Sequence, residues 1–222
     1  SIGLCLSSLL ADAKPGEFEV IVVCNGCSDD TANAARAFGS RVRVIEIEVG
    51  SKIIALNLGN KAARYFPRLY LDADLELSTG SARALLSAAA ESNCLAAIGR
   101  METDLSQVPW LMRQYYAVWS RHGYLRHGKF GGAYALSEAG CNHVGVLPPV
   151  INDDEYVRRR IPAEGLQVLA DCSFRAQVPR TLRDLISVRT RIHRGNRQLR
   201  TLARAPGSET MAPAPGQSLQ RL

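Results

Sequence analysis

In the stretch Arg68-Leu69-Tyr70-Leu71-Asp72-Ala73-Asp74-Leu75-Glu76-Leu77, two aspartates follow directly on a short apolar run. The run predicts a buried strand, so Asp72 and Asp74 lie at its carboxyl end, where ligands bind in open α/β sheets. Side chains two residues apart on extended backbone point the same way. Two such carboxylates can hold a hard cation that in turn holds a diphosphate. The alternative is a polar strand end that begins a turn, and the Asp-x-Asp motif alone does not decide between the two.

Strand and helix patterns alternate through the first hundred residues. Apolar and β-branched runs predict strands at 18–24, 41–49 and 94–100, besides the strand that ends at Asp72. Helices are predicted between them, one of them capped by Ser78 or Thr79. This order predicts a parallel sheet with right-handed crossovers. Residues 2–10 have a helical pattern, whereas a doubly wound fold is expected to begin with a strand, so we expect this chain to lack its first strand.

The second half has a less regular pattern. An aromatic-rich helix is predicted at 109–121, where core packing is favoured over an acceptor platform. A strand at 130–136 contains two glycines, which indicate close approach by another group. Short strands are predicted at 166–170 and 174–178, and a basic amphipathic helix at 179–202, broken at Gly195. From residue 205 the composition turns to Pro, Gly, Ser and Ala and predicts a disordered tail, 205–222.

Length and charge limit the classes of protein. The 222 residues suit one α/β domain, expected at 1–204 with halves 1–100 and 101–204. No apolar, uncharged stretch reaches the roughly 18 residues that a membrane span needs. The net charge is +6, and the excess lies mostly after residue 157. A basic face can meet anionic lipid, nucleic acid or a phosphorylated substrate, and a solvated helix face is the alternative. The arginine run lacks interleaved aromatics, which disfavours a nucleic-acid partner.

Five further motifs accompany the Asp-x-Asp motif in a set order. The six motifs are VVCNGCSDDT at 22–31, GSKIIALNLG at 50–59, LDAD at 71–74, GGAYALS at 131–137, NDDEYV at 152–157 and RTRIHRGN at 189–196. Their order and spacing resemble the inverting nucleotide-diphospho-sugar glycosyltransferases with the GT-A fold, the glycosyltransferase family 2-like enzymes. The resemblance covers about residues 1–200. It implies an α/β fold with a Rossmann-like, mostly parallel sheet and helices on both faces.

The resemblance also implies a donor site. Cys24 and Asn25 match the positions that contact the nucleotide base, and Asn25 can hydrogen-bond a pyrimidine or guanine edge, which leaves UDP and GDP both open. Lys52 matches a lysine near the nucleotide, where its charge suits a phosphate. Asp72 is implied to lie near the ribose, and Asp74 to bind Mg²⁺ or Mn²⁺ on the diphosphate, with Asp72 beside it.

The acceptor side is implied by the later motifs. Asp153 and Asp154 match an acidic pair whose second member is the general base, so Asp154 is predicted to take the proton of the acceptor hydroxyl. An acidic helix N-terminus is the structural alternative for this pair. Further contacts to the acceptor or diphosphate are predicted at Gly131, Gly132, Arg191, His193 and Arg194, with a solvated surface histidine as the alternative for His193. No tryptophan follows Arg191 or Arg194, which departs from the Gln-x-x-Arg-Trp pattern of processive members and favours single transfer.

Together these residues predict metal-assisted sugar transfer, with inversion, from a nucleotide-diphosphate donor to an acceptor hydroxyl. One rival hypothesis is a nucleotidyltransferase that makes nucleotide sugars, although no Gly-rich loop bearing Lys or Arg is visible near the N-terminus. Another is a truncated, non-catalytic module that binds nucleotide or an anionic surface. The resemblance implies a lipid-linked or glycan acceptor in cell-envelope polysaccharide synthesis. We expect a cytoplasmic protein with peripheral contact at the inner face of the membrane through the basic helix.

Overall fold

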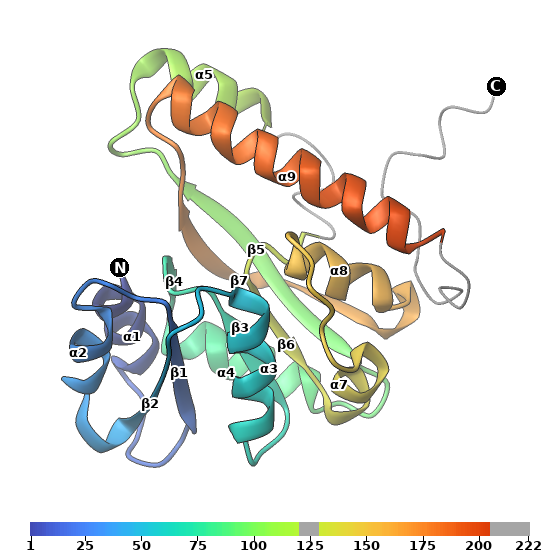
Figure 1. Cartoon of the computed structure of the whole chain (residues 1–222). Coiled ribbons are helices and arrows are strands. Elements are labelled where there is room, and N and C mark those ends of the chain that lie inside the picture. The colour runs from blue at the N-terminus through green and yellow to red at the C-terminus, as the bar shows by residue number, and fades with distance from the viewer. Residues whose placement is uncertain (120–128, 205–222) are drawn as a thin grey trace.

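The computed structural model describes residues 1–119 and 129–204 of the chain (Figure 1). The strands are β1 (Val20–Asn25), β2 (Val42–Ile47), β3 (Arg68–Leu71), β4 (Leu75–Leu77), β5 (Ala96–Asp104), β6 (Ala133–Leu136) and β7 (Leu166–Gln177). The helices are α1 (Ile2–Leu10), α2 (Thr31–Arg36), α3 (Lys52–Ala62), α4 (Thr79–Ala89), α5 (Trp110–Trp119), α7 (Glu138–Val144), α8 (Asp153–Arg160) and α9 (Leu182–Leu202). The predicted tail at 205–222 lies outside the described residues, and the domain boundaries stay a prediction.

Hydroxyl side chains begin several of these helices. The side-chain oxygens of Ser51, Ser78, Ser137 and Thr181 each accept a hydrogen bond from a backbone N–H of the first turn. Such caps satisfy donors that a helix start otherwise leaves without partners. The choice between Ser78 and Thr79 is therefore settled in favour of Ser78 as the cap of α4. None of the described helices is both long and apolar enough to cross a membrane.

The strands form two sheets. β1 and β2 pair in parallel, and the second sheet has the order β3-β6-β5-β7-β4, in which β5 and β7 are parallel and the other pairs antiparallel. The expectation that the first-half strands pair with one another in one parallel sheet is wrong. β3 and β5 run the same way, but β6 lies between them because its four buried residues, Ala133–Leu136, need a neighbouring strand at each edge. The α/β class and the presence of parallel ladders are confirmed.

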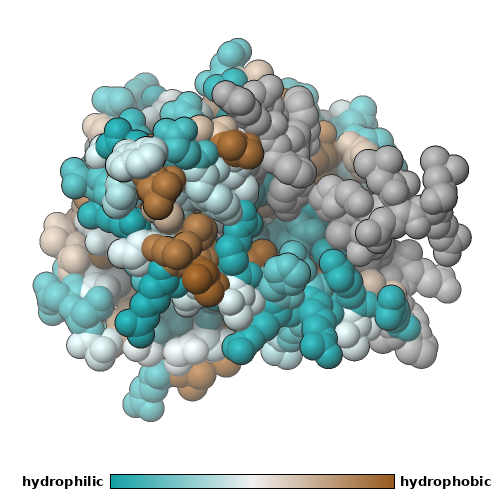
Figure 2. Space-filling model, turned by 90° about the horizontal axis from the view of Figure 1, so that it is seen from above, coloured by the Kyte–Doolittle hydropathy of each residue, from teal (hydrophilic) through white to brown (hydrophobic). Residues whose placement is uncertain are grey.

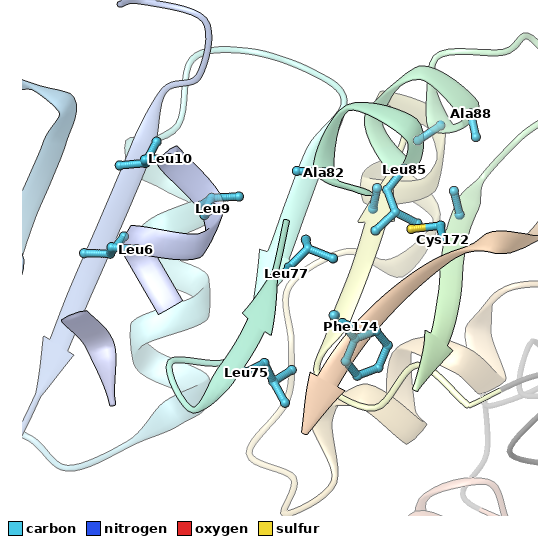
Figure 3. Packing of buried hydrophobic residues seen from close by; sticks show 14 of the residues in the cluster. Leu6, Leu9, Leu10, Leu75, Leu77, Ala82, Leu85, Ala88, Cys172 and Phe174 are labelled. Carbon is cyan, nitrogen blue, oxygen red and sulfur yellow. The ribbon is translucent and has the colours of Figure 1, made fainter. Parts of the chain in front are cut away.

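Alternating side chains of the central strands pack into two hydrophobic cores, one on each face of the sheet. Ala97 and Ala135 pack with the cluster that contains α1 and α4, whereas Ala96 and Tyr134 pack with the cluster under α7, α8 and α9. Figure 3 shows the first cluster, in which the leucines of β4 lie between those of α1 on one side and Phe174 of β7 and the labelled leucine of α4 on the other. Helices therefore cover both faces, as expected.

Three expectations about the second half are corrected. β7 is one strand of 12 residues rather than two short ones, and its pairing with β5 shifts register between Ile98 and Arg100. α9 continues through Gly195 without a break, because that residue is buried where the helix crosses another segment. In α5 only Tyr116 is buried, and Trp110 is 72% exposed, so this helix does not pack as a core element.

Candidate active site

The first aspartate of the Asp-x-Asp motif is held where β3 meets β6. The Asp72 N–H donates to the Gly132 carbonyl at 2.8 Å, and the Asp72 carbonyl accepts from Leu75 at 3.1 Å, which closes a turn with Asp74 exposed. A Cβ atom on Gly132 would lie 2.4 Å from Asp72 Oδ2, and its φ of +85° favours glycine. The group that approaches this glycine is therefore the Asp72 carboxylate.

A lysine joins two of the predicted carboxylates. Lys52 is the first residue of α3, and its Nζ lies 2.7 Å from Asp72 Oδ1 and 3.0 Å from Asp153 Oδ2. Burial alone would lower the pKa of Lys52, but attraction to Asp72 and Asp153 outweighs it and raises the pKa. Burial raises the pKa of Asp72, an effect that Lys52 opposes and that the charges of Asp153 and Asp74 reinforce. The ammonium thus connects the ends of two segments about 80 residues apart.

The residues predicted to contact the nucleotide base lie on the same side of the fold as Lys52. Asn25 ends β1, and the Gly26 N–H that follows donates to the Ile47 carbonyl at 2.9 Å. A Cβ on Gly26 would meet the Gly50 Cα at 2.7 Å, so this turn lies against the segment that leads into Lys52. Asn25 is half-buried, whereas the Cys24 side chain is buried. Asn25 is thus the better placed of the two to meet a base.

The acidic pair opens helix α8. Asp153 is buried and Asp154 half-buried, while Glu155 forms ion pairs with Arg158 and Arg159. Burial and the neighbouring charge of Asp153 raise the pKa of Asp154. A carboxylate with a raised pKa is a better proton acceptor at neutral pH. Lys52, Asp72, Asp74, Asp153 and Asp154 are called the carboxylate edge below.

Asn152, which sequence reasoning did not single out, anchors this helix start to α9. Its Nδ2 donates to the Ile192 carbonyl at 3.1 Å and to Asn196 Oδ1 at 3.0 Å. A Cβ atom on Gly195 would lie 2.4 Å from Asn152 Oδ1. The signal in the sequence that could have identified Asn152 was its position directly before the acidic pair.

Lys129 and Tyr134 were missed too. Lys129 has a pKa lowered by burial, although the charge of Asp154 raises it. Tyr134 is fully buried, and burial followed by the charge of Asp153 raises its pKa well above the usual value. The only available signal for either residue was proximity to Gly131 and Gly132. Both side chains therefore form part of the surroundings of the acidic pair.

The residues predicted on α9 make no direct polar contact with the carboxylate edge in the described residues. Arg191, His193 and Arg194 are exposed, and in the described part of the chain no hydrogen bond or ion pair joins them to the carboxylates. His193 and Arg194 instead line a hollow of about 390 Å³ between α5 and α9. Gly131 lies against Phe174 and Met101, so it supports the turn before β6.

A divalent cation fits the two carboxylates of the turn, provided that a substrate completes its ligands. Within residues 1–119 and 129–204 no group of three or more Cys, His, Asp or Glu side chains could hold a metal. Mg²⁺ sites commonly use one or two carboxylates, with water and substrate phosphates as the remaining ligands. Asp72 and Asp74 satisfy that requirement, because their charges lie close enough to affect each other and Asp74 is exposed.

Comparison with known proteins identifies the family of the chain. The family described as glycosyl transferase family 2 matches residues 1–145, about two thirds of the chain. The chain belongs to glycosyl transferase family 2. No curated protein sequence gives a significant match.

Two solved structures resemble this family 2 chain in fold. One is the mannosyltransferase PcManGT from Pyrobaculum calidifontis in complex with GDP-Man and Mn²⁺, with a TM-score of 0.70, 19% identity and coverage of 94% of this chain. The other is a mycobacterial protein, with a TM-score of 0.56, 19% identity and 83% coverage. The chain spans 63% and 65% of these two structures, less than two thirds of either. The likeness establishes the GT-A fold of the chain.

Proposed function

We propose that this chain transfers a sugar from a nucleoside-diphosphate donor to an acceptor hydroxyl with inversion. The observation that carries the proposal is the Lys52 ammonium, which joins Asp72 of the Asp-x-Asp turn to Asp153 at the start of α8. This contact holds the predicted donor carboxylates beside the predicted base, as in-line displacement requires. The family match favours sugar transfer over nucleotide-sugar synthesis or a non-catalytic module.

Asp154 is the proposed general base. The acceptor oxygen forms a bond to the anomeric carbon as its proton passes to the Asp154 carboxylate. The bond between that carbon and the diphosphate breaks, and its electron pair goes to the phosphate oxygen. Burial and Asp153 raise the pKa of Asp154, which favours this proton transfer. The attack and the departure take place on opposite faces of the sugar, which is what produces inversion.

Asp74 and Asp72 are the residues that would hold Mg²⁺ or Mn²⁺. The bound cation supplies neutralisation of the charge that develops on the departing diphosphate. Mn²⁺ accompanies GDP-Man in the Pyrobaculum calidifontis structure, which supports a cation here. Lys52 contributes a fixed positive charge beside the same carboxylates.

The donor is proposed to be a GDP- or UDP-sugar whose base meets Asn25. GDP-Man in the similar structure makes GDP the first nucleotide to test. The acceptor is proposed to be a lipid-linked or glycan hydroxyl of the cell envelope. The protein would then act in the cytoplasm, at the inner face of the membrane.

The test is calorimetric titration of GDP and UDP into the chain, with and without Mn²⁺. We expect binding that needs the cation and is lost in Asp74→Ala. Asp171→Ala is the matched control, because Asp171 is an exposed aspartate on β7 away from the turn. Binding of neither nucleotide to folded protein, or equal binding by Asp74→Ala and the parent chain, would contradict the proposal.

A further inference from the structure

Exposed apolar side chains gather on two neighbouring helices at one end of the molecule. On α5 they are Trp110, Leu111 and Val118, and on the first turns of α9 they are Leu182, at 63% exposure, and Ile186. In Figure 1 these helices lie side by side above the sheets, and Figure 2, seen from that side, shows brown hydrophobic patches bordered by teal hydrophilic residues. These five residues, together with the arginines of α9, are called the α5–α9 face.

The two helices are joined by specific contacts. The Tyr116 hydroxyl donates to the Pro179 carbonyl at 3.0 Å, and Arg189 Nε donates to the Tyr115 hydroxyl at 2.8 Å. The Arg189 guanidinium also lies 5.6 Å from the centroid of the Trp119 ring. The face is therefore a defined surface, and its exposed apolar residues are not the ends of a frayed segment.

The charge of this face is strongly positive. α9 contains six arginines and one aspartate, and that aspartate, Asp184, is engaged with Thr181 at the helix start. Leu185, Ile186, Arg189 and His193 lie on one side of α9 and line the hollow of about 390 Å³ toward α5. Apolar and basic side chains of α9 thus line the same hollow.

We infer that the α5–α9 face docks on an anionic lipid bilayer. Helices that lie in a membrane interface place apolar and tryptophan side chains among the acyl chains and arginines among the headgroups. The excess of arginine complements the negative potential of anionic lipid. Nucleic acid would instead favour stacked aromatics along the arginines, and Arg189 alone of them lies against aromatic rings in the described residues.

The carboxylate edge lies next to this surface. Asn152, at the start of α8, bonds the backbone of α9, and the Lys129 ammonium lies 5.0 Å from the Trp119 ring while its charge acts on Asp154. A bilayer on the α5–α9 face would therefore bring membrane-embedded hydroxyl acceptors near the proposed base. The identification of membrane-embedded hydroxyls as acceptors rests on the proposed function. The docking of the face on a bilayer does not depend on it.

Co-sedimentation of the full chain with vesicles tests the docking. One set of vesicles is pure phosphatidylcholine, and the other is an equimolar mixture with phosphatidylglycerol. We expect binding to the anionic vesicles alone, weakened by salt as the Debye length falls from about 30 Å at 0.01 M to about 3 Å at 1 M. The double variant Leu182→Ser/Ile186→Ser should bind at least about tenfold more weakly, because burial of two apolar side chains is lost.

Two matched controls separate the face from the rest of the surface. Val146→Ser removes an apolar side chain that is 82% exposed on another part of the molecule and should leave vesicle binding unchanged. Arg183→Glu should weaken binding more than Arg43→Glu on β2, since both arginines are exposed but only the first belongs to the face. Equal effects of paired variants, binding to both kinds of vesicle alike, or no binding at low salt would overturn the inference.

The nucleotide titration on the same preparation distinguishes the two proposals. Cation-dependent nucleotide binding without vesicle binding leaves the proposed function intact and overturns the docking. Vesicle binding that is lost in the apolar double variant, without any nucleotide binding, supports the docking and contradicts the proposed function. Competition by inorganic phosphate that removes all binding would overturn bilayer docking in favour of a simple anion site.

Discussion

The carboxylate edge and the α5–α9 face are held in opposite ways. At the edge, side chains from α3, β3 and α8 contact one another, and Asn152 and Gly132 fix them from behind. On the face, the first half of α9 has no buried residue and α5 has only Tyr116. The groups proposed to react are fixed by several elements, whereas the groups proposed to meet a partner are left exposed. Substitutions should therefore affect activity and folding at the edge, and association at the face.

The largest effect is expected at Asp154. Asp154→Asn removes the proposed proton acceptor and should lower the rate of transfer about 100- to 10,000-fold. Nucleotide affinity should stay near that of the parent chain, since the donor carboxylates are intact. Rates with the donor identified by titration, measured beside Asp171→Asn, check this. A variant with nearly full activity would show that the base lies elsewhere.

A larger residue at position 132 should disrupt the carboxylate edge through a steric clash with Asp72. Gly132→Ala places a methyl group where the Asp72 carboxylate now lies and should weaken nucleotide binding as well as folding. Gly16→Ala is the matched control, because Gly16 also has a positive φ but nothing lies within 4 Å of its added Cβ. The free energy of unfolding should fall about 1–3 kcal/mol further for Gly132→Ala, as overpacking does elsewhere. Equal losses, measured by denaturant titration, would mean that the contact with Asp72 is unimportant.

Gly195 connects the two regions, because α9 crosses Asn152 there. Overpacking by Gly195→Ala costs about 1–3 kcal/mol, which offsets or exceeds the roughly 1 kcal/mol that alanine gains in a helix. Gly3→Ala in α1 meets nothing within 4 Å and should stabilise the chain by up to about 1 kcal/mol. Denaturant titration of both variants checks the difference. Stabilisation of the same size in both would show that α9 packs loosely on the start of α8.

The acidic limb of the pH–rate profile for transfer should shift in opposite directions in two variants that each remove one charge. The proposed base is the ionised form of Asp154, so the rate should rise as pH passes upward through its raised pKa. Asp153→Asn removes a charge that raises this pKa and should move the acidic limb to lower pH. Lys129→Met removes a charge that lowers it and should move the limb to higher pH. Lys61→Met, at an exposed lysine of α3, should leave the limb in place. Shifts in the same direction would contradict the assignment of Asp154.

The smallest effect on folding is expected at the α5–α9 face. Leu182→Ser/Ile186→Ser should change the free energy of unfolding by no more than about 0.5 kcal/mol, since both side chains are exposed. Thermal or denaturant unfolding of the variant beside Val146→Ser checks this. A loss of several kcal/mol would mean that the face is covered in the folded chain, and the contrast between the two regions would fail.

Local patterns were sufficient for much of this molecule. The strand that ends at Leu71, a helix cap at Ser78 or Thr79 and the acidic start of α8 follow from alternation, hydroxyl placement and helix polarity within a few residues. The motif order likewise led to the family before any contact was known. Lys129 and Tyr134 near Asp154 were not found, because their only signal in the sequence was proximity to Gly131 and Gly132.

Pairings between distant segments required the folded chain. The position of β6 between β3 and β5, and the continuity of β7, depend on pairing between strands that are far apart in the sequence. The residue pattern of a single strand carries no information on which strands lie beside it. The contacts of Gly132 with Asp72 and of Gly195 with Asn152 also required the folded chain, because both glycines allow close approach by a residue from a distant segment. Residue types alone therefore led to the hypothesis about the chemistry of the site, whereas the geometry of the site arises from packing between segments far apart in the chain.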